Sequence, residues 1–201
     1  ADTYMIHTFT NGGMTLRWFR DKFCQIEMQA QELGLDDAYN MISKEVSKVP
    51  AGSDGLVMLP HLAGSNAPDV NAKAKGVWFG FTLQHTRAHF MRSVMESLGY
   101  IVKRNIDSLA DMGIEVKEIR SLGGGSKSDV WNQIKSDICQ IPLETVNSVE
   151  AASLGAAILA GKATGIFKNL NEAAESMVQV KKRTLPNAEN KAVYEDGYEM
   201  Y

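Results

Sequence analysis

The sequence has few cysteines and no long apolar run. Its 201 residues include two cysteines, Cys24 and Cys139, which lie far apart and match neither a metal-ligand spacing nor a disulfide framework. This usage suits a reducing cytoplasm. No apolar run approaches the ~20 residues needed to span a bilayer, and the first residues show no signal-peptide pattern. We therefore expect a cytoplasmic protein with no membrane partner.

An excess of charge of one sign is also lacking. The chain carries 21 Lys and Arg residues against 24 Asp and Glu residues, a formal net charge of -3, and these charges are scattered along it. Nucleic-acid binders usually carry a basic patch or stripe, so we expect no nucleic-acid partner. The hydrophobic content of 44% is ordinary for a globular protein, and the length fits one large domain or two small ones.

The first residues, ADTYMIHTFTNGG, lack an initiator methionine and already have a strand-like pattern. We therefore expect the chain to be a piece of a longer gene product.

Apolar periodicity predicts an alternation of strands and helices. Helical spacing covers residues 14–33, 36–48, 85–112, 127–140, 148–165, 171–178 and about 188–200. Strand-like runs cover residues 4–10, 56–60, 77–82, 114–122 and 142–147. Strands that alternate with helices are typical of an α/β layered domain with a largely parallel sheet.

Three consecutive glycines, Gly123, Gly124 and Gly125, stand between a predicted strand and a predicted helix. Backbone N–H groups and a helix N-terminus meet in such a turn, and an anion can bind there. Ser126 or Ser128 can cap the helix that follows. The stretch is neither a G-x-G-x-x-G fingerprint nor a P-loop. From these residues alone, a tight turn and a phosphate cradle are about equally well supported.

A second glycine pair repeats the same layout. Gly12 and Gly13 follow the strand-like run at residues 4–10 and precede a helical pattern. By itself this pair is better explained as the start of a helix. Two such turns in one α/β domain could nevertheless converge on a shared cleft at the carboxyl ends of the strands.

His85 and His89 are four residues apart on one face of the longest predicted helix, a spacing that zinc sites use. Neither a third ligand nor the glutamate of an H-E-x-x-H motif accompanies them. We therefore expect no metal site and favour an amphipathic helix. The alanine- and glycine-rich helix at 148–165 is expected to pack closely on a sheet.

Two blocks of sequence resemble the C-terminal domain of the FGGY carbohydrate kinases, and within that family the xylulose kinases most. The blocks are LPHLAGSNAP…KGVWFGFTLQHTRAHFMRSVMES and SLGGGSKSDVWNQIKSDICQIPLETVNSVEAASLGAAILAG, in the family's order and spacing. The first block matches the family's second signature at Gly76, Trp78, Gly80, His89, Phe90, Ser93, Met95 and Glu96. Phe81 departs from that signature, where an aliphatic residue is usual.

The resemblance implies an actin-like ATPase, or ribonuclease H-like, α/β fold with a mixed sheet flanked by helices. Residues 1–201 would form a single C-terminal domain, with the N-terminal sugar-binding domain and the start of this domain upstream. It further implies ATP and Mg²⁺ as cofactors, and a sugar substrate bound through the N-terminal domain. Kinases of this family are often dimers, so a homodimer is one expectation.

The resemblance also implies residue roles. Gly13, Arg17, Gly123, Gly124, Gly125 and Ser128 would form the nucleotide site, with Gly124 and Gly125 against the nucleotide and Ser128 near the adenosine. The catalytic base would be an aspartate of the N-terminal domain. We therefore assign no catalytic residue and no metal ligand to this chain, and we do not give the role of base to Asp54 or Asp69.

One departure concerns the sugar. Xylulose kinases usually carry a Glu-Arg pair before the proline of the loop matched here by AGSNAP, and this sequence has Ser65 and Asn66. D-Xylulose is the first expectation, and another ketose, a polyol or a sugar acid stays compatible. A non-catalytic actin-like nucleotide-binding module is the alternative from a different functional class.

Overall fold

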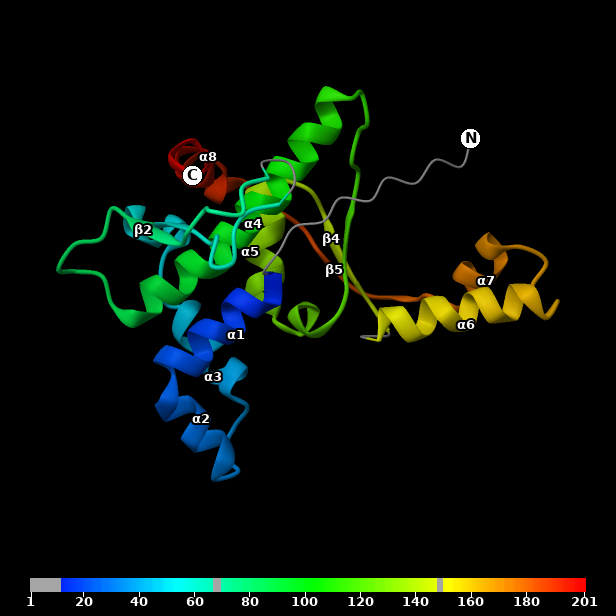
Figure 1. The fold of residues 1–201 in the computed structure, drawn as a ribbon, viewed down its shortest axis with the longest axis horizontal. Coiled ribbons are helices and arrows are strands. Elements are labelled where there is room, and N and C mark those ends of the chain that lie inside the picture. Colours follow the sequence, from blue (N-terminus) through cyan, green and yellow to red (C-terminus); the bar gives the residue numbers. More distant parts are fainter. Residues whose placement is uncertain (1–11, 67–69, 148–149) are drawn as a thin grey trace.

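The computed structural model describes residues 12–66, 70–147 and 150–201 (Figure 1). The strand expected at residues 4–10 and Asp69 lie outside the described residues. The helices are α1 (Gly12–Phe23), α2 (Gln25–Glu32), α3 (Ala38–Val46), α4 (Arg87–Asp111), α5 (Asp129–Cys139), α6 (Ala151–Ala163), α7 (Leu170–Met177) and α8 (Lys191–Met200). The strands are β1 (Val57–Leu59), β2 (Val77–Phe79), β3 (Ile119–Ser121), β4 (Leu143–Val146) and β5 (Val180–Thr184), and short 3-10 helices are η1 (Ala51–Gly55), η2 (Gly124–Lys127) and η3 (Ala188–Asn190).

The helix expected at residues 14–33 is in fact two helices, α1 and α2, which are separated at Cys24. Cys24 has φ -121° and ψ 46°, outside the helical region. The guanidinium of Arg87 on α4 donates a hydrogen bond of 3.0 Å to the carbonyl oxygen of Phe23. A side chain that enters the backbone hydrogen-bond ladder in this way is a known cause of a helix break. The break therefore results from a contact with a distant part of the chain.

Other helix ends follow local rules. The side chain of Asp37 caps α3 by accepting hydrogen bonds from the backbone N–H groups of Tyr39 and Asn40. Gly34 ends α2 with a φ of +78°, a conformation that favours glycine. The sequence pattern predicted a helix end near residue 33 and a helix start near residue 36, and both are confirmed to within two residues.

The sheet is mixed rather than largely parallel. β4 lies in the centre, parallel to β3 and antiparallel to β5. The sequence pattern did not predict β5, in which four of the five residues are exposed. Its pairing is supported by charge, because Glu144 on β4 contacts Arg120 on β3 and Arg183 on β5, at N–O distances of 3.2 and 3.6 Å. β1 and β2 form a separate antiparallel pair.

α4 is the centre of the core, and α5 packs along it (Figure 1). A Cβ atom at Gly99 of α4 would lie 2.5 Å from Cδ1 of Ile138, so glycine permits the two helices to approach. Tyr100 forms ring contacts with Tyr194, Tyr198 and Tyr201 of the C-terminal segment. α8 is therefore attached to the same central helix.

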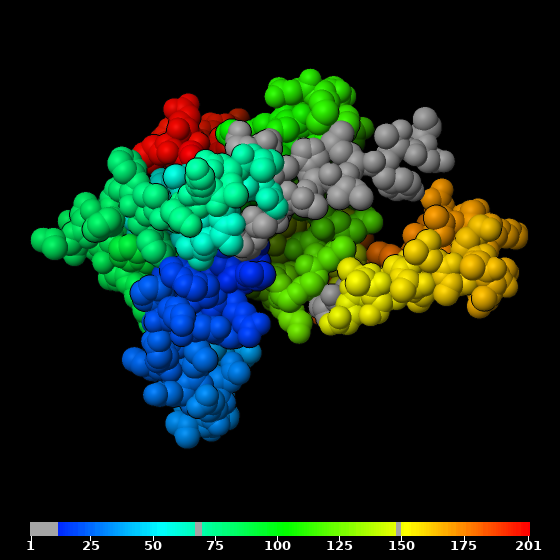
Figure 2. Space-filling view, viewed as in Figure 1, coloured from blue at the N-terminus to red at the C-terminus, as the bar shows by residue number. Residues whose placement is uncertain are grey.

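α6 and α7 extend away from this core (Figures 1 and 2). α6 is almost entirely apolar or small in composition, yet Gly161 is its buried residue. Its contacts are mainly with α7 and with the turn between them, where a Cβ atom at Gly161 would lie 2.7 Å from the ring of Phe167. Within the described residues, the close packing on a sheet that the sequence suggested for this helix is not found. None of the helices described here is long and apolar enough to cross a membrane.

A buried carboxylate joins α4 to two other elements. Glu96 accepts hydrogen bonds from Nε of Arg92 at 2.8 Å, from Oγ of Ser53 at 2.6 Å, from the backbone N–H of Gly52 at 2.9 Å and from the hydroxyl of Tyr194 at 3.1 Å. Gly52, Ser53 and Asp54 belong to η1 and have φ values of 79°, 49° and 52°. Such left-handed backbone is strained outside glycine and persists only where the surroundings impose it. Glu96 provides that constraint.

We expect Glu96→Ala to lower the free energy of unfolding by about 3–5 kcal/mol, because it leaves the charge of the buried Arg92 guanidinium without its ion-pair partner. Urea denaturation measures this loss. The control Glu45→Ala removes an exposed carboxylate that pairs with Lys48, and it should change the free energy by less than about 0.5 kcal/mol. Equal effects of the two substitutions would show that the Glu96 network does not hold the fold together.

Candidate functional site

A pocket lies between α1, α3, α4 and the segment from η2 to α5, with a cavity volume of about 570 Å³. All of the predicted site residues except Gly123 line it: Gly13, Arg17, Gly124, Gly125 and Ser128. The two glycine turns, more than 100 positions apart in the chain, therefore line one cavity, an arrangement that the sequence left open. Figure 1 shows the first turn of α1 beside the start of α5.

Glycine stands at positions 123, 124 and 125 for three different structural reasons. Gly123 has a φ of +75°, which favours glycine. A Cβ atom at Gly125 would lie 2.7 Å from the ring of Trp131, so this glycine permits close packing. A Cβ atom at Gly124, like one at Gly13, would meet nothing within 4 Å. Neither a turn conformation nor packing within the described chain accounts for glycine at position 124, and the space beside it belongs to the pocket.

Ser128, rather than Ser126, caps the helix that follows. Its Oγ accepts a hydrogen bond of 3.2 Å from the backbone N–H of Trp131. Ser126 closes the turn instead, with its hydroxyl donating to the carbonyl oxygen of Gly123 at 2.7 Å. The backbone around the glycines is therefore braced from both sides, which gives a ligand a rigid surface.

The floor of the pocket is apolar and rigid. Leu16, Met95 and Trp131 line it and are buried. The indole Nε1 of Trp131 donates to the carbonyl oxygen of Met95 at 3.1 Å, and Nζ of Lys135 lies 4.9 Å from the ring centroid. Burial lowers the pKa of Lys135 to about 8. An apolar floor of this kind suits the face of a flat ring.

Positive charge lies around the opening. Arg17 and Lys127 line the pocket and are exposed, and Arg17 has Asp21 as its ion-pair partner, at 3.6 Å. α1 begins at Gly12 and Gly13, and the N-terminus of a helix of this length carries partial positive charge. The pocket thus combines an apolar floor with cationic edges, which suits a ligand with one flat apolar part and one anionic part.

One wall of the pocket was not predicted from the sequence. It is formed by one face of α3, with Tyr39, Asn40 and Ser43. Oγ of Ser43 lies 3.2 Å from Oγ of Ser128, so this wall is joined to the glycine turn. Their spacing of three and four residues shows that these polar side chains share a helix face. No local signal indicates that this face borders a pocket.

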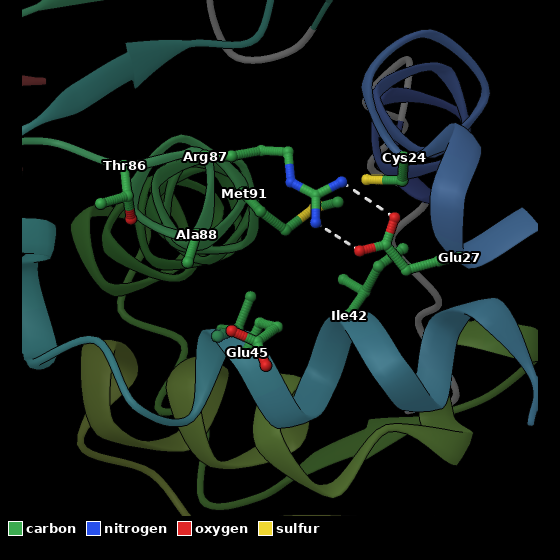
Figure 3. Close-up of a pocket in the computed structure, with 9 residues that line it drawn as sticks. Cys24, Glu27, Ile42, Glu45, Thr86, Arg87, Ala88 and Met91 are labelled. Carbon is green, nitrogen blue, oxygen red and sulfur yellow. Dashed lines mark hydrogen bonds and ion pairs between the residues drawn. The ribbon is translucent and has the colours of Figure 1, made fainter.

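A second, smaller cavity of about 170 Å³ lies between α2, α3 and the start of α4 (Figure 3). Arg87 and Glu27 face each other across it in a two-pronged ion pair, with one N–O distance of 2.8 Å. The hydrogen bonds from Arg87 lower the pKa of Glu27, and burial raises the pKa of the Cys24 thiol to about 11. None of the predicted site residues lines this cavity, and its groups join α2 to α4.

His85 and His89 hold the start of α4. Nδ1 of His85 accepts from the backbone N–H of Thr82 at 2.8 Å, and Nδ1 of His89 accepts from that of Thr86 at 3.1 Å. Nε2 of His89 contacts Oδ2 of Asp54 at 3.1 Å. Both histidines thus already have structural partners. Across the described ranges, no group of three or more His, Cys, Asp or Glu residues could hold a metal ion.

Comparison with known proteins identifies the family. The model of the C-terminal domain of the FGGY family of carbohydrate kinases matches residues 1–164. The chain belongs to this family. Its fold is accordingly the actin-like α/β fold with a mixed sheet flanked by helices, as the resemblance implied.

Two curated relatives and one solved structure show the range of the likeness. A xylulose kinase of Staphylococcus epidermidis is 33% identical over 201 residues, which is 100% of this chain and 38% of the relative. A gluconokinase of Bacillus subtilis is 39% identical over 157 residues, 77% of this chain and 30% of the relative. The ligand-bound xylulose kinase from Lactobacillus acidophilus superimposes with a TM-score of 0.81 at 27% identity, covering 96% of this chain and 37% of that one. The chain thus spans less than two fifths of the length of these relatives.

The different roles of the glycines can be tested with a matched pair of substitutions. Gly125→Ala should lower the free energy of unfolding by about 1–3 kcal/mol, because the new methyl group meets the fixed ring of Trp131. Gly124→Ala should change it by less than about 0.5 kcal/mol, because the methyl group enters open space. Urea denaturation of both variants gives the comparison, and a larger loss for Gly124→Ala would contradict the geometry.

Proposed function

We propose that this chain is the ATP-binding half of a carbohydrate kinase that transfers the γ-phosphoryl group of ATP to a sugar hydroxyl, with D-xylulose as the favoured sugar. The observation that carries the proposal is the convergence of Gly13 and Gly124 on one pocket, where neither glycine has a packing partner. Membership of the FGGY family supports the reaction class.

The shape and charge of the pocket support ATP as its ligand. A cavity of about 570 Å³ falls within the usual range of roughly 300–1,000 Å³ for small-molecule sites. The buried floor around Trp131 suits the adenine ring, with Ser128 near the adenosine. The bare main chain at Gly124 and Gly125 would lie against the ribose and α-phosphate, while Gly123 shapes the turn. Mg²⁺ would come with the nucleotide and neutralise charge on its phosphates.

Phosphoryl transfer needs groups that this pocket does not supply. The oxygen of the sugar hydroxyl forms a bond to the γ-phosphorus while the bond from that phosphorus to the β–γ bridging oxygen breaks, and the hydroxyl proton passes to a carboxylate base. The carboxylate that lines the pocket, Asp37, already caps α3, and Asp54 contacts His89. We therefore assign the base and most sugar contacts to an N-terminal domain of the intact kinase.

The relatives indicate several candidate sugars rather than one. The names of the relatives include xylulose kinase and gluconokinase, a ketose and a sugar-acid enzyme. Ser65, at the position where xylulose kinases usually carry part of a Glu-Arg pair, makes paired backbone hydrogen bonds with Asn71 at 2.9 and 3.1 Å. These paired hydrogen bonds hold Ser65 beside Asn71 without the charged pair, so a sugar other than D-xylulose stays among the candidates.

A panel of sugars tests the activity directly. The full-length protein with ATP and Mg²⁺ should phosphorylate D-xylulose fastest among D-xylulose, D-gluconate, glycerol and L-ribulose, as measured by coupled ADP release. Residues 1–201 alone should give no turnover because they lack the base. Turnover by residues 1–201 alone would refute the division of labour, and turnover of D-gluconate alone would change the sugar and keep the kinase.

A steric substitution tests the pocket. In the full-length protein, Gly124→Leu should raise the KM for ATP by at least roughly tenfold, because a Cβ atom at this position meets no other residue within 4 Å and the side chain extends into the space of the pocket. The KM for the sugar should stay unchanged, and this second constant serves as the internal control. An unchanged KM for ATP would place the nucleotide elsewhere.

A further inference from the structure

The polar face of α3 stands opposite the anionic end of the proposed ligand. Phosphates are favoured at the first turn of α1 and along the bare main chain at Gly124, where N–H groups and cations gather. The purine ring of the nucleotide then lies against the floor at Trp131 and the wall formed by Asn40 and Ser43. These two residues are three apart on one helix, so their side chains are neighbours on its surface.

The orientation of the Asn40 amide is determined by its neighbour Asp36. Oδ1 of Asp36 accepts hydrogen bonds from Nδ2 of Asn40 at 3.1 Å and from the backbone N–H of Asp37 at 2.8 Å, and Oδ2 accepts from Nζ of Lys44 at 2.8 Å. The hydrogen bond from Lys44, followed by those from Asn40 and Asp37, lowers the pKa of Asp36 to about 2. A carboxylate only accepts hydrogen bonds, so the amide must present its NH₂ group to Asp36.

The amide oxygen of Asn40 is consequently the end left for a ligand. Within the described residues no donor is within hydrogen-bonding distance of this Oδ1 atom. It can accept one or two hydrogen bonds but donates none. The wall therefore presents a fixed acceptor beside the pocket.

The hydroxyls of Ser43 and Ser128 supply the complementary donor. Oγ of Ser128 accepts from the backbone N–H of Trp131, and the two hydroxyl oxygens are 3.2 Å apart. Two hydroxyl hydrogens are available and their mutual hydrogen bond uses one of them. The other can be donated to a ligand.

We propose that Asn40 and Ser43 select adenine over guanine in this pocket, with the amide oxygen accepting from the 6-amino group and the hydroxyl pair donating to an adjacent ring nitrogen. Guanine carries a carbonyl oxygen in place of the 6-amino group, so two acceptors would face each other. This inference rests on the proposed function, because it assumes that a purine nucleotide occupies the pocket.

The test is nucleotide binding to the full-length protein, measured by calorimetry with ADP, GDP and purine riboside 5′-diphosphate, which lacks the 6-amino group. The unmodified protein should bind ADP roughly tenfold more tightly than either analogue, the value of one well-placed hydrogen bond. Asn40→Ala should weaken ADP roughly tenfold and leave the affinity for purine riboside 5′-diphosphate unchanged. Equal weakening of both ligands would mean a structural role for Asn40 and would overturn the proposal, as would no change at all.

Ser47→Ala is the matched control. Ser47 belongs to the end of the same helix, its hydroxyl donates to the carbonyl oxygen of Lys44, and it does not line the pocket. This variant should retain the full preference for ADP over purine riboside 5′-diphosphate. Loss of that preference in the control would overturn the assignment to the Asn40 face.

The two proposals fail in different ways. If the protein prefers ADP through Asn40 but phosphorylates no sugar, the proposed function fails and the selection of adenine stands. If a sugar is phosphorylated and Asn40→Ala keeps the preference for ADP, the selection by Asn40 fails alone. If no nucleotide binds, both fail.

Discussion

The arrangement around the pocket depends on the ion pair and the hydrogen bonds of the buried Glu96 carboxylate. A charge removed from water is costly unless it is paired and fully hydrogen-bonded. Here Arg92 of α4 supplies the opposite charge, and three further donors, from η1 and α8, complete the hydrogen bonds. Met95, the residue before Glu96, holds the indole of Trp131 through its carbonyl oxygen. The position of α4 therefore sets the floor of the pocket.

Local rules determine much of the fold, and these parts could be read from the sequence. Asp37 caps a helix because its short acceptor side chain suits that position, and Gly34 ends one because it tolerates a positive φ. The break at Cys24 could not be predicted in this way. Its cause is a hydrogen bond from Arg87, 64 positions from Phe23 in the chain. Similarly, β5 lacks an apolar pattern and pairs with β4 partly through the contact of Arg183 with Glu144.

The candidate site was predicted on one side and missed on the other. A run of glycines between a predicted strand and a predicted helix is visible in a sequence, so the turns that contain Gly13 and Gly124 could be named in advance. The wall formed by Asn40 and Ser43 is an ordinary polar helix face, and only the packing of α3 against α4 and α5 places it at a cavity. The same packing separates the roles of Gly123, Gly124 and Gly125, which look equivalent in the sequence.

The two cysteines are buried and react slowly with thiol reagents. Burial raises the pKa of Cys24 to about 11 and that of Cys139 to about 12. The thiolate is the reactive form, and at pH 7 a thiol with a pKa of about 11 is ionised in only about one molecule in ten thousand. A cysteine introduced at an exposed position would therefore react with maleimide dyes far ahead of both native thiols. Fluorescent reporters could be placed beside the pocket without first removing Cys24 or Cys139.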